Sequence, residues 1–289
     1  MQILKCKQIV FSLLALPLLA FADSLAYEKA RVLFEKTEYA ASARLLEAIA
    51  SKSGSELNLL GRDYFMMGEY KKATELFEKA SSAEPRNSSH WHWLGRTFGR
   101  RAELSSFVAA PGYAIKARQN FERAVALDGR NIEALNDLFE YYLQAPGFLG
   151  GGVDKAQALI EKIAVADPVE RHWALARVAE EKKDFKTAEA ELRRTVELAP
   201  KQIGRVVDLA TFLAKRGRTQ ESDAIFEQAR RIEPNHPTYL WQRASLLIEQ
   251  KRNLPEAAKL LRQYVVAKVT PDEDHKEEAR KLLAKIDGA

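Results

Sequence analysis

Apolar residues recur at helical spacing along the stretch from Gly54 to Asn87, in two short runs that a polar segment separates. Gly68 lies where the first run should end as a helix, and Pro85 stops the second, since proline cannot continue a helix. Each run places its apolar side chains along one stripe. The pattern therefore predicts two short helices, each with one face to bury.

Small residues stand where these two helices should meet. Gly61 and Ala73 let the backbones approach, and Tyr64 and Phe77 fill the space beside them. One unit of 34 residues carries the whole pattern, at Leu57, Leu60, Gly61, Tyr64, Ala73, Phe77, Ala80 and Pro85. The unit resembles a tetratricopeptide repeat, with Leu57 where that family often has tryptophan.

The resemblance implies an all-α fold in which such units stack into a right-handed superhelical solenoid. The pattern returns along the chain and predicts about six to seven repeats, of which the first and the last are the least regular. A capping helix is predicted after them, over residues 272–287. The predicted repeats cover residues 23–53, 54–87, 88–131, 132–168, 169–202, 203–236 and 237–270. Extra residues fall around 102–113 in the third repeat and 145–152 in the fourth. Residues 23–289 are thus expected to form a single solenoid domain.

Residues 1–22 follow a different pattern. Lys5 and Lys7 precede an apolar run over residues 9–21, and Ala20 and Ala22 flank Phe21 in the small-x-small order of a signal peptidase site. A membrane anchor is the alternative, but spanning a bilayer takes roughly 20 apolar residues, and this run is shorter and contains a proline. We expect a cleaved secretory signal peptide and export, most simply to a bacterial periplasm, with no stable membrane anchor afterwards.

The charge balance does not indicate a nucleic-acid partner. The chain has 45 basic and 40 acidic side chains, a net charge of +5 that falls to +3 when Lys5 and Lys7 are removed. Evenly mixed charges differ from the clustered basic patch of nucleic-acid-binding proteins. The only cysteine, Cys6, precedes the apolar run of the signal. The exported chain is therefore expected to have no disulfide and no cysteine metal ligand, and to depend on an ordinary apolar core.

The sequence lacks the motifs of catalysis and cofactor binding. It contains no Gly-x-Ser-x-Gly, no His-Glu-x-x-His and no Walker loop. His90 and His92 are two residues apart on a predicted helix and should point in nearly opposite directions, which does not suit a metal site. Paired carboxylates such as Glu180 and Glu181 fit a solvated surface. We expect no enzymatic activity, no cofactor and no metal.

One face of the first helices carries arginine at a repeated position. Arginine directly follows the small residue of the first helix in four of the first five repeats. This face is predicted to be a partner-binding groove made of Tyr27, Arg31, Asn58, Arg62, His92, Arg96, Arg100, Trp173 and Arg177, with Asn136 and Glu140 at the equivalent positions of the fourth repeat. The alternative is that these arginines pair with neighbouring acidic residues on exposed helix faces.

The chemistry of this face favours an acidic partner. Arginine forks bind carboxylates bidentately and aromatic rings add apolar contact area, so the face suits an extended acidic peptide or a free C-terminal carboxylate. The family's carboxylate-clamp subtype uses lysines and asparagines, most of which this sequence lacks. Recognition of chaperone tails is therefore not expected.

The two segments with extra residues share a small-Pro-Gly-aromatic order. They contain Pro111, Gly112 and Tyr113 in the third repeat, and Pro146, Gly147 and Phe148 in the fourth. Equivalent turns of a solenoid lie on the same edge, so we expect these segments to be neighbours. The glycine run 150–152 precedes a predicted helix and could expose amide donors to an anion, but the rest of a nucleotide loop is missing. We favour a role in locking two repeats together over ligand binding.

Together these patterns predict a non-catalytic scaffold or adaptor of the cell envelope that holds a protein or peptide in its groove. One alternative is an enzyme or enzyme subunit with a site at the insert edge, defined by residues 102–113 and 145–152. Another is a binder of anionic envelope glycan or lipid headgroups. The sequence leaves the partner and the oligomeric state open.

Overall fold

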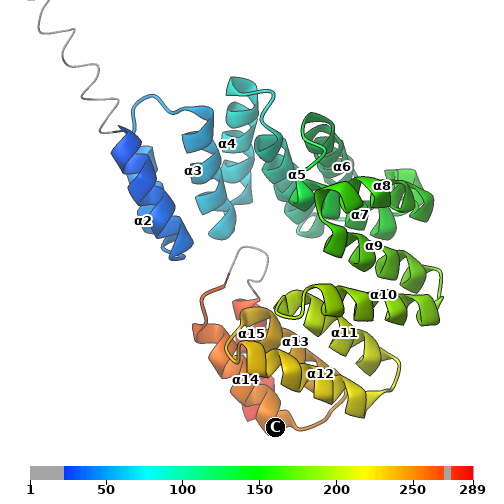
Figure 1. Cartoon of the computed structure of the whole chain (residues 1–289). Helices are drawn as coiled ribbons and strands as arrows, with labels where there is room; N and C mark the ends of the chain where they lie inside the picture. Colours follow the sequence, from blue (N-terminus) through cyan, green and yellow to red (C-terminus); the bar gives the residue numbers. More distant parts are fainter. Residues whose placement is uncertain (1–22, 270–274, 289) are drawn as a thin grey trace, which may run out of the picture. The chain divides into compact units, whose positions relative to one another are not determined.

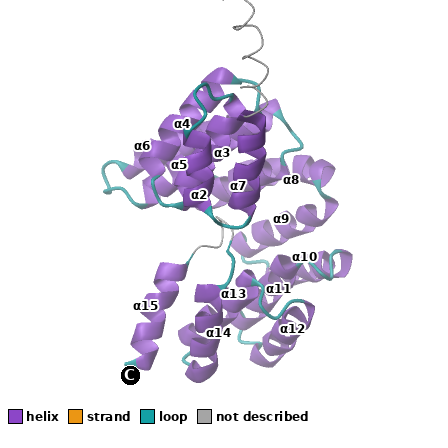
Figure 2. Ribbon diagram, turned by 90° about the vertical axis from the view of Figure 1, so that its left-hand side faces the viewer, coloured by secondary structure: helices purple, strands orange, loops and turns teal. Residues whose placement is uncertain are grey.

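The computed structural model describes residues 23–269 and 275–288, and all secondary structure in this part of the chain is helical (Figures 1 and 2). The chain divides into two compact units, one ending at Leu127 and one beginning at Asp128. These are unit 1 and unit 2. The predicted signal peptide and the first residues of the predicted capping helix, 272–274, lie outside the described residues.

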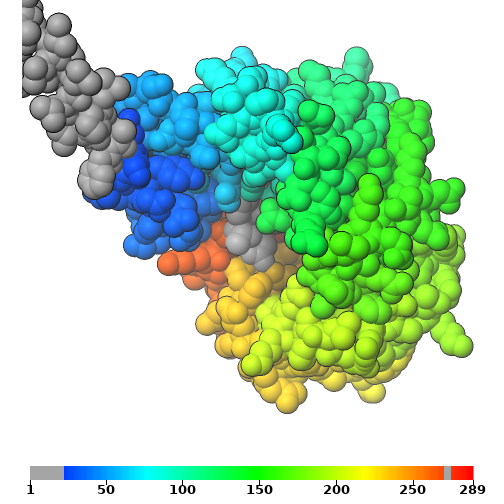
Figure 3. All heavy atoms as spheres, turned by 45° about the horizontal axis from the view of Figure 1, so that its top comes forward, coloured from blue at the N-terminus to red at the C-terminus, as the bar shows by residue number. Residues whose placement is uncertain are grey.

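Unit 1 consists of helices that follow one another in antiparallel pairs. A helix over residues 23–35 is followed by α2 (Tyr39–Glu47), α3 (Gly54–Met66), α4 (Tyr70–Ala83), α5 (Ser88–Glu103) and α6 (Ala110–Leu127). Each pair is one predicted repeat, so the all-α repeat architecture expected from the sequence is confirmed. In the space-filling view, the described residues of this unit form a closely packed surface coloured from blue to green along the sequence (Figure 3).

Unit 2 continues the pattern and ends on an additional helix. It contains α7 (Ile132–Gln144), the short 3-10 helix η1 (Gly147–Leu149), α8 (Val153–Ala166), α9 (Pro168–Glu181), α10 (Phe185–Leu198), α11 (Ile203–Lys215), α12 (Thr219–Ile232), α13 (Pro237–Glu249), α14 (Leu254–Val266) and α15 (Lys276–Asp287). The last helix packs on α14 and buries Ala279. The described part of the predicted capping helix is therefore present.

Local chemistry sets the ends of these helices. Ser53 caps α3 by accepting a hydrogen bond from the Glu56 backbone N–H, and the Glu56 carboxylate accepts one from the Ser53 N–H at 2.6 Å. Gly68 follows α3 with a φ of 78°, a left-handed conformation that glycine adopts without steric cost. At α9, Asp167 caps the helix and Pro168 occupies its first turn. The predicted turn at Gly68 is thus confirmed.

Close packing within a repeat depends on the small residues of the first helix. A Cβ atom placed on Gly61 would lie 2.8 Å from the ring of Phe77, and one on Gly95 would lie 2.6 Å from the ring of Phe121. Both phenylalanines come from the second helix of the same repeat, and Phe77 is fully buried. In these two repeats the first helix therefore needs glycine at this position for the ring to fit as it does.

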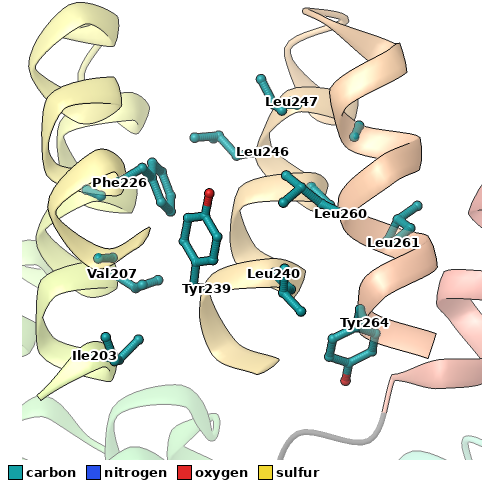
Figure 4. Packing of buried hydrophobic residues seen from close by; sticks show 14 of the residues in the cluster. Ile203, Val207, Phe226, Tyr239, Leu240, Leu246, Leu247, Leu260, Leu261 and Tyr264 are labelled. Atoms are coloured by element: carbon teal, nitrogen blue, oxygen red, sulfur yellow. The ribbon is translucent and has the colours of Figure 1, made fainter. Parts of the chain in front are cut away.

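The core of unit 2 continues across repeat boundaries. Phe226 of α12 lies beside Tyr239 of α13, and Leu240 lies near Leu260 and Leu261 of α14 (Figure 4). All five side chains have at most 6% of their surface exposed. Each repeat therefore completes the core of the next one, as expected of a solenoid.

Contacts between helices identify the inner face of each unit. First helices contact the first helices of the next repeat: α3 contacts α5, α7 contacts α9 and α11 contacts α13, while α9 and α11 are joined by the Glu170–Arg205 ion pair. No contact of similar extent joins the second helices α4 and α6, α8 and α10, or α10 and α12 in the described residues. A stack of helix pairs whose helices lie closer together on one side curves toward that side. The first helices therefore line the inner, concave face within each unit.

The extra residues of the third repeat lengthen its helices. Helix α5 runs to Glu103 and α6 begins at Ala110, so Pro111, Gly112 and Tyr113 form its first turn and not an inserted turn. Proline is compatible with this position because the first backbone N–H groups of a helix have no partner within it. In the fourth repeat, Pro146 to Gly152 do form a connection between helices, which contains η1.

Replacing Gly61 with leucine is expected to destabilise unit 1 by about 1–3 kcal/mol, because the new side chain overlaps the Phe77 ring. Gly99 on α5 provides a control, since a Cβ there meets nothing within 4 Å. Thermal and denaturant unfolding of both leucine variants would measure the difference. Equal stability of the two would contradict the packing described above.

Candidate functional site

Arginines on the inner face of unit 1 lie against aromatic rings. The Arg62 guanidinium lies 4.4 Å from the ring centre of Phe34 and 4.7 Å from that of Trp93. Arg96 lies 4.6 Å from the same Trp93 ring. Because Phe34, Arg62 and Trp93 come from the first helices of three successive repeats, these contacts connect neighbouring repeats along the inner face.

The other two arginines of this face in unit 1 are more accessible. Arg31 has 54% of its side chain exposed and pairs with Glu28 at 3.1 Å on its own helix. Arg100 has 45% exposed and contacts Glu103 and the Tyr70 hydroxyl. Exposed pairs of this kind contribute little to stability. Both arginines can therefore exchange their present partners for a bound carboxylate at low cost.

Two predicted groove residues are instead buried. Asn58 is 7% exposed, and His92 is 1% exposed with its ring beside Trp93 and Phe121. His92 faces α6, the second helix of its own repeat, so it belongs to the packing interface and not to an accessible wall. Both side chains are therefore packed inside the unit in this structure, and their contact with a partner stays a prediction. Tyr27 keeps part of its surface accessible.

Arg62→Ala is expected to cost about 1–2 kcal/mol of stability, because it removes a guanidinium held between two rings. Arg31→Ala should stay within about 0.5 kcal/mol, as exposed substitutions usually do. Denaturant unfolding of the two variants provides the comparison. If Arg62→Ala were as neutral as Arg31→Ala, the stacking would have no structural role.

The inner face of unit 2 contains a pocket of about 350 Å³. Trp173 and Arg177 line it, and both were predicted as groove residues. The remaining lining residues come from α7, α9, α10, α11 and α13, and are Glu140, Glu180, Leu192, Asp208, Thr211, Phe212, Lys215 and Gln242. The pocket therefore extends along the first helices of successive repeats.

Arg177 is held by two carboxylates of this pocket. Its Nε donates to Glu140 Oε1 at 2.9 Å and its Nη2 to Glu140 Oε2 at 3.2 Å, while Nη1 donates to Glu180 Oε2 at 3.1 Å. Burial alone would lower the pKa of Arg177, but these carboxylates more than offset it and raise the pKa above its usual range. The alternative considered for the arginines, pairing with neighbouring acidic residues, thus applies to Arg177, as it does to the exposed Arg31 and Arg100.

A second ion-pair network lies next to the pocket and was not predicted. Arg205 of α11 donates to both oxygens of Glu170 on α9 and to Asp208 Oδ2 at 2.8 Å, and its guanidinium lies 4.5 Å from the Trp173 ring centre. Burial raises the pKa of Asp208 above its ordinary value, and the positive charges of Arg205 and Arg177 offset only part of this effect. Asp208 lines the pocket, and 39% of its side chain is exposed. The spacing of Arg205 and Asp208 on one helix face was the available sequence signal.

The insert edge of the third repeat is stabilised by internal contacts. Tyr113 accepts a hydrogen bond from Arg101 Nη2 at 2.7 Å, and its ring stacks on Phe98. The loop before α6 exposes Phe107 and Val108, with 94% and 88% of their surfaces accessible. Tyr113 therefore has a packing role, while the apolar side chains of the loop stay accessible.

The insert edge of the fourth repeat requires glycine at Gly151, where a Cβ would lie 1.7 Å from the Ala145 carbonyl oxygen. The Tyr141 hydroxyl donates to the Leu149 carbonyl and Lys155 Nζ to the Gly150 carbonyl, at 3.0 and 2.8 Å. These contacts lock the connection locally, and Phe148 is 81% exposed. That the two insert segments are neighbours stays a prediction, because they belong to different units.

The described residues contain no group of three or more His, Cys, Asp or Glu side chains that could hold a metal ion. His90 Nε2 contacts Glu84 Oε2 at 3.0 Å, and His90 is 2% exposed. Within the same described ranges, no helix is long and apolar enough to span a membrane.

Comparison with known proteins supports the fold. A tetratricopeptide repeat family model matches residues 207–272. This range covers most of the predicted sixth and seventh repeats and ends just after the seventh. No protein with a curated description matches the chain. A tetratricopeptide repeat protein from Parabacteroides merdae is similar in structure, with a TM-score of 0.62 and 15% identity over 92% of this chain and 98% of that one.

Two further structures have the same fold. A thermophilic TPR protein of Thermus thermophilus has a TM-score of 0.56 and 20% identity, over 67% of this chain and all of that one. A chain of the Cut9–Hcn1 hetero-tetramer of the APC/C has a TM-score of 0.50 and 16% identity, over 91% of this chain and 46% of that one. Residues 207–272 thus belong to the tetratricopeptide repeat family by sequence, and the chain has the all-helical fold of a tetratricopeptide repeat solenoid.

Proposed function

We propose that the chain is a non-catalytic scaffold that binds an extended segment of another protein on the inner faces of its first helices. The observation that carries this proposal is the pocket of about 350 Å³ in unit 2, which is lined along the first helices of successive repeats. A groove with apolar floor and polar walls is suited to an extended peptide. One structurally similar chain belongs to the Cut9–Hcn1 hetero-tetramer, which agrees with a role in protein binding.

The inner face of unit 1 is the proposed site for an acidic part of the partner segment or its C-terminal carboxylate. Arg31 and Arg100 are half-exposed there, and the Arg62 and Arg96 guanidinium groups add positive charge beside aromatic rings. Charge-assisted hydrogen bonds to a carboxylate are worth roughly twice those between neutral groups. Binding to unit 1 should weaken as salt concentration rises.

The cell envelope is the proposed location. This part of the proposal rests on the charged start, short apolar run and small-x-small end of residues 1–22. The exported protein is expected to begin at Asp23, the first residue of the predicted first repeat. N-terminal sequencing of protein isolated from the envelope fraction would test this, and a sequence beginning at Met1 would contradict it.

A crosslinking pull-down from the envelope fraction would test partner binding. The double variant Arg31→Ala/Arg100→Ala removes two accessible arginines of the inner face of unit 1. The matched control, Arg44→Ala/Arg123→Ala, removes two exposed arginines of the second helices α2 and α6. We expect the wild type and the control to capture the same partner proteins. The inner-face variant should capture these proteins at least tenfold less. Equal capture by all three folded proteins would contradict the proposal.

A further inference from the structure

The unit 2 pocket differs from the inner face of unit 1 in its available charge. Arg177 donates through Nε, Nη1 and Nη2 to Glu140 and Glu180, so an incoming carboxylate would have to displace two carboxylates already in place. Among the lining residues, Glu140, Glu180 and Asp208 outnumber the cations Arg177 and Lys215. The pocket therefore has an excess of one negative charge.

Two carboxylate oxygens of the pocket are open to a ligand. Glu180 accepts from Arg177 on Oε2, and Asp208 accepts from Arg205 on Oδ2. No described residue donates a hydrogen bond to Glu180 Oε1 or Asp208 Oδ1. Because burial disfavours the charge of Asp208, a bound cation would stabilise its carboxylate.

The same pocket offers apolar surface beside these oxygens. Trp173 is partly accessible and supplies most of this surface, with the buried side chains of Leu192 and Phe212 behind it. A long basic side chain can place its methylene groups along such a floor while its charged end reaches a carboxylate. A bare inorganic cation would leave this apolar surface uncovered.

We propose that the unit 2 pocket binds the side chain of an arginine or lysine in the partner segment, with its charged group at Asp208 and Glu180. This inference rests on the proposed function, because it takes the pocket to be part of a peptide-binding face. For unit 2 it predicts a basic ligand group, whereas the arginine pattern of the sequence predicted an acidic one. The partner segment then has an acidic part for unit 1 and a basic residue for unit 2.

Blocked Gly-Gly-X-Gly-Gly peptides, with arginine, lysine, citrulline or glutamate as X, provide the probes. Each is titrated into the full exported chain up to about 20 mM, a range that covers single-contact affinities, and binding is followed by the NMR signal of the Trp173 indole N–H. The arginine and lysine peptides should bind at least tenfold more tightly than the glutamate peptide and the neutral citrulline peptide. Equal affinities, or no binding by any peptide, would overturn the inference.

Variants then test the assigned carboxylates. Asp208→Asn should weaken binding of the arginine peptide at least tenfold, whereas Glu161→Gln on α8, with an 84% exposed side chain, should leave it unchanged. Lys215→Glu should tighten binding, a gain that misfolding cannot produce. Unchanged affinity in both Asp208→Asn and Lys215→Glu would contradict the site.

These measurements separate the inference from the proposed function. If the peptides fail to bind while the envelope pull-down still depends on Arg31 and Arg100, only the charge preference of the pocket is wrong. If the pull-down fails while the arginine peptide binds through Asp208, the pocket is a basic-group site and the scaffold role of unit 1 is wrong.

Discussion

Unit 1 is expected to lose up to about 4 kcal/mol of stability as the pH rises from about 4 to about 7, because of the buried carboxyl group of Asp63. This side chain is fully buried and accepts a hydrogen bond from Ser42 Oγ at 2.7 Å. Burial raises its pKa to about 7, and Ser42 and Arg62 offset only part of that effect. The folded state therefore favours the neutral acid.

The sign of this effect follows from the two protonation equilibria. Below the ordinary aspartate pKa of about 3.9, Asp63 is neutral in both states and contributes no pH dependence. Between that value and about 7, the unfolded chain releases the proton while the folded chain retains it, so stability falls as the pH rises. Above about 7 both states are ionised and the loss is constant.

Asp63→Asn should remove this loss and make unit 1 more stable than the wild type at pH 8, with little difference at pH 4. Denaturant unfolding across this range would measure it, followed by tryptophan fluorescence, to which Trp91 and Trp93 of unit 1 contribute. Glu75→Gln is the control, because Glu75 is exposed on α4. Parallel pH profiles for the wild type and Asp63→Asn would contradict the assignment.

Phe77→Ala is expected to destabilise unit 1 by about 3–5 kcal/mol. Phe77 is fully buried, fits against Gly61, and stacks with Trp93 of the next repeat at a centroid distance of 6.1 Å. Its removal leaves a cavity at the contact between the second and third repeats. The effect should therefore be among the largest of any single substitution in unit 1.

Phe107→Ala is the matched control for this prediction. It removes the same side chain from a loop position that is 94% exposed, so the change should stay within about 0.5 kcal/mol. Thermal and denaturant unfolding of the two variants would be compared with the wild type. A loss below 1 kcal/mol for Phe77→Ala would show that the repeat core is assigned incorrectly.

The fold could be predicted because its signals are local in sequence. Gly61, Gly68 and Phe77 lie within one repeat, and their spacing alone indicates two helices, the turn between them and the buried ring. Proline and glycine were more ambiguous. Pro111 and Gly112 resemble a turn but form the first turn of α6, where proline costs no hydrogen bond.

The candidate site was harder to predict because its contacts join distant positions. Periodicity indicates that Arg62 and Arg177 face the same side of their helices, but not what they meet there. Arg62 meets Phe34 and Trp93, and Arg177 meets Glu140, which precedes it by 37 residues. His92 shows the same limit, because a rotation of the helix by about one residue, roughly 100°, decides whether its side chain faces the groove or the interface with α6.

The central claim is that partners bind on the faces formed by the first helices. Site-specific photocrosslinking tests this claim most directly. A photoreactive residue would be placed at Arg100 on α5 and Thr211 on α11, and separately at Arg123 on α6 and Arg194 on α10, which belong to the second helices. We predict that adducts with envelope proteins form at Arg100 and Thr211 and not at Arg123 or Arg194. Adducts found only at the second-helix positions would contradict the account.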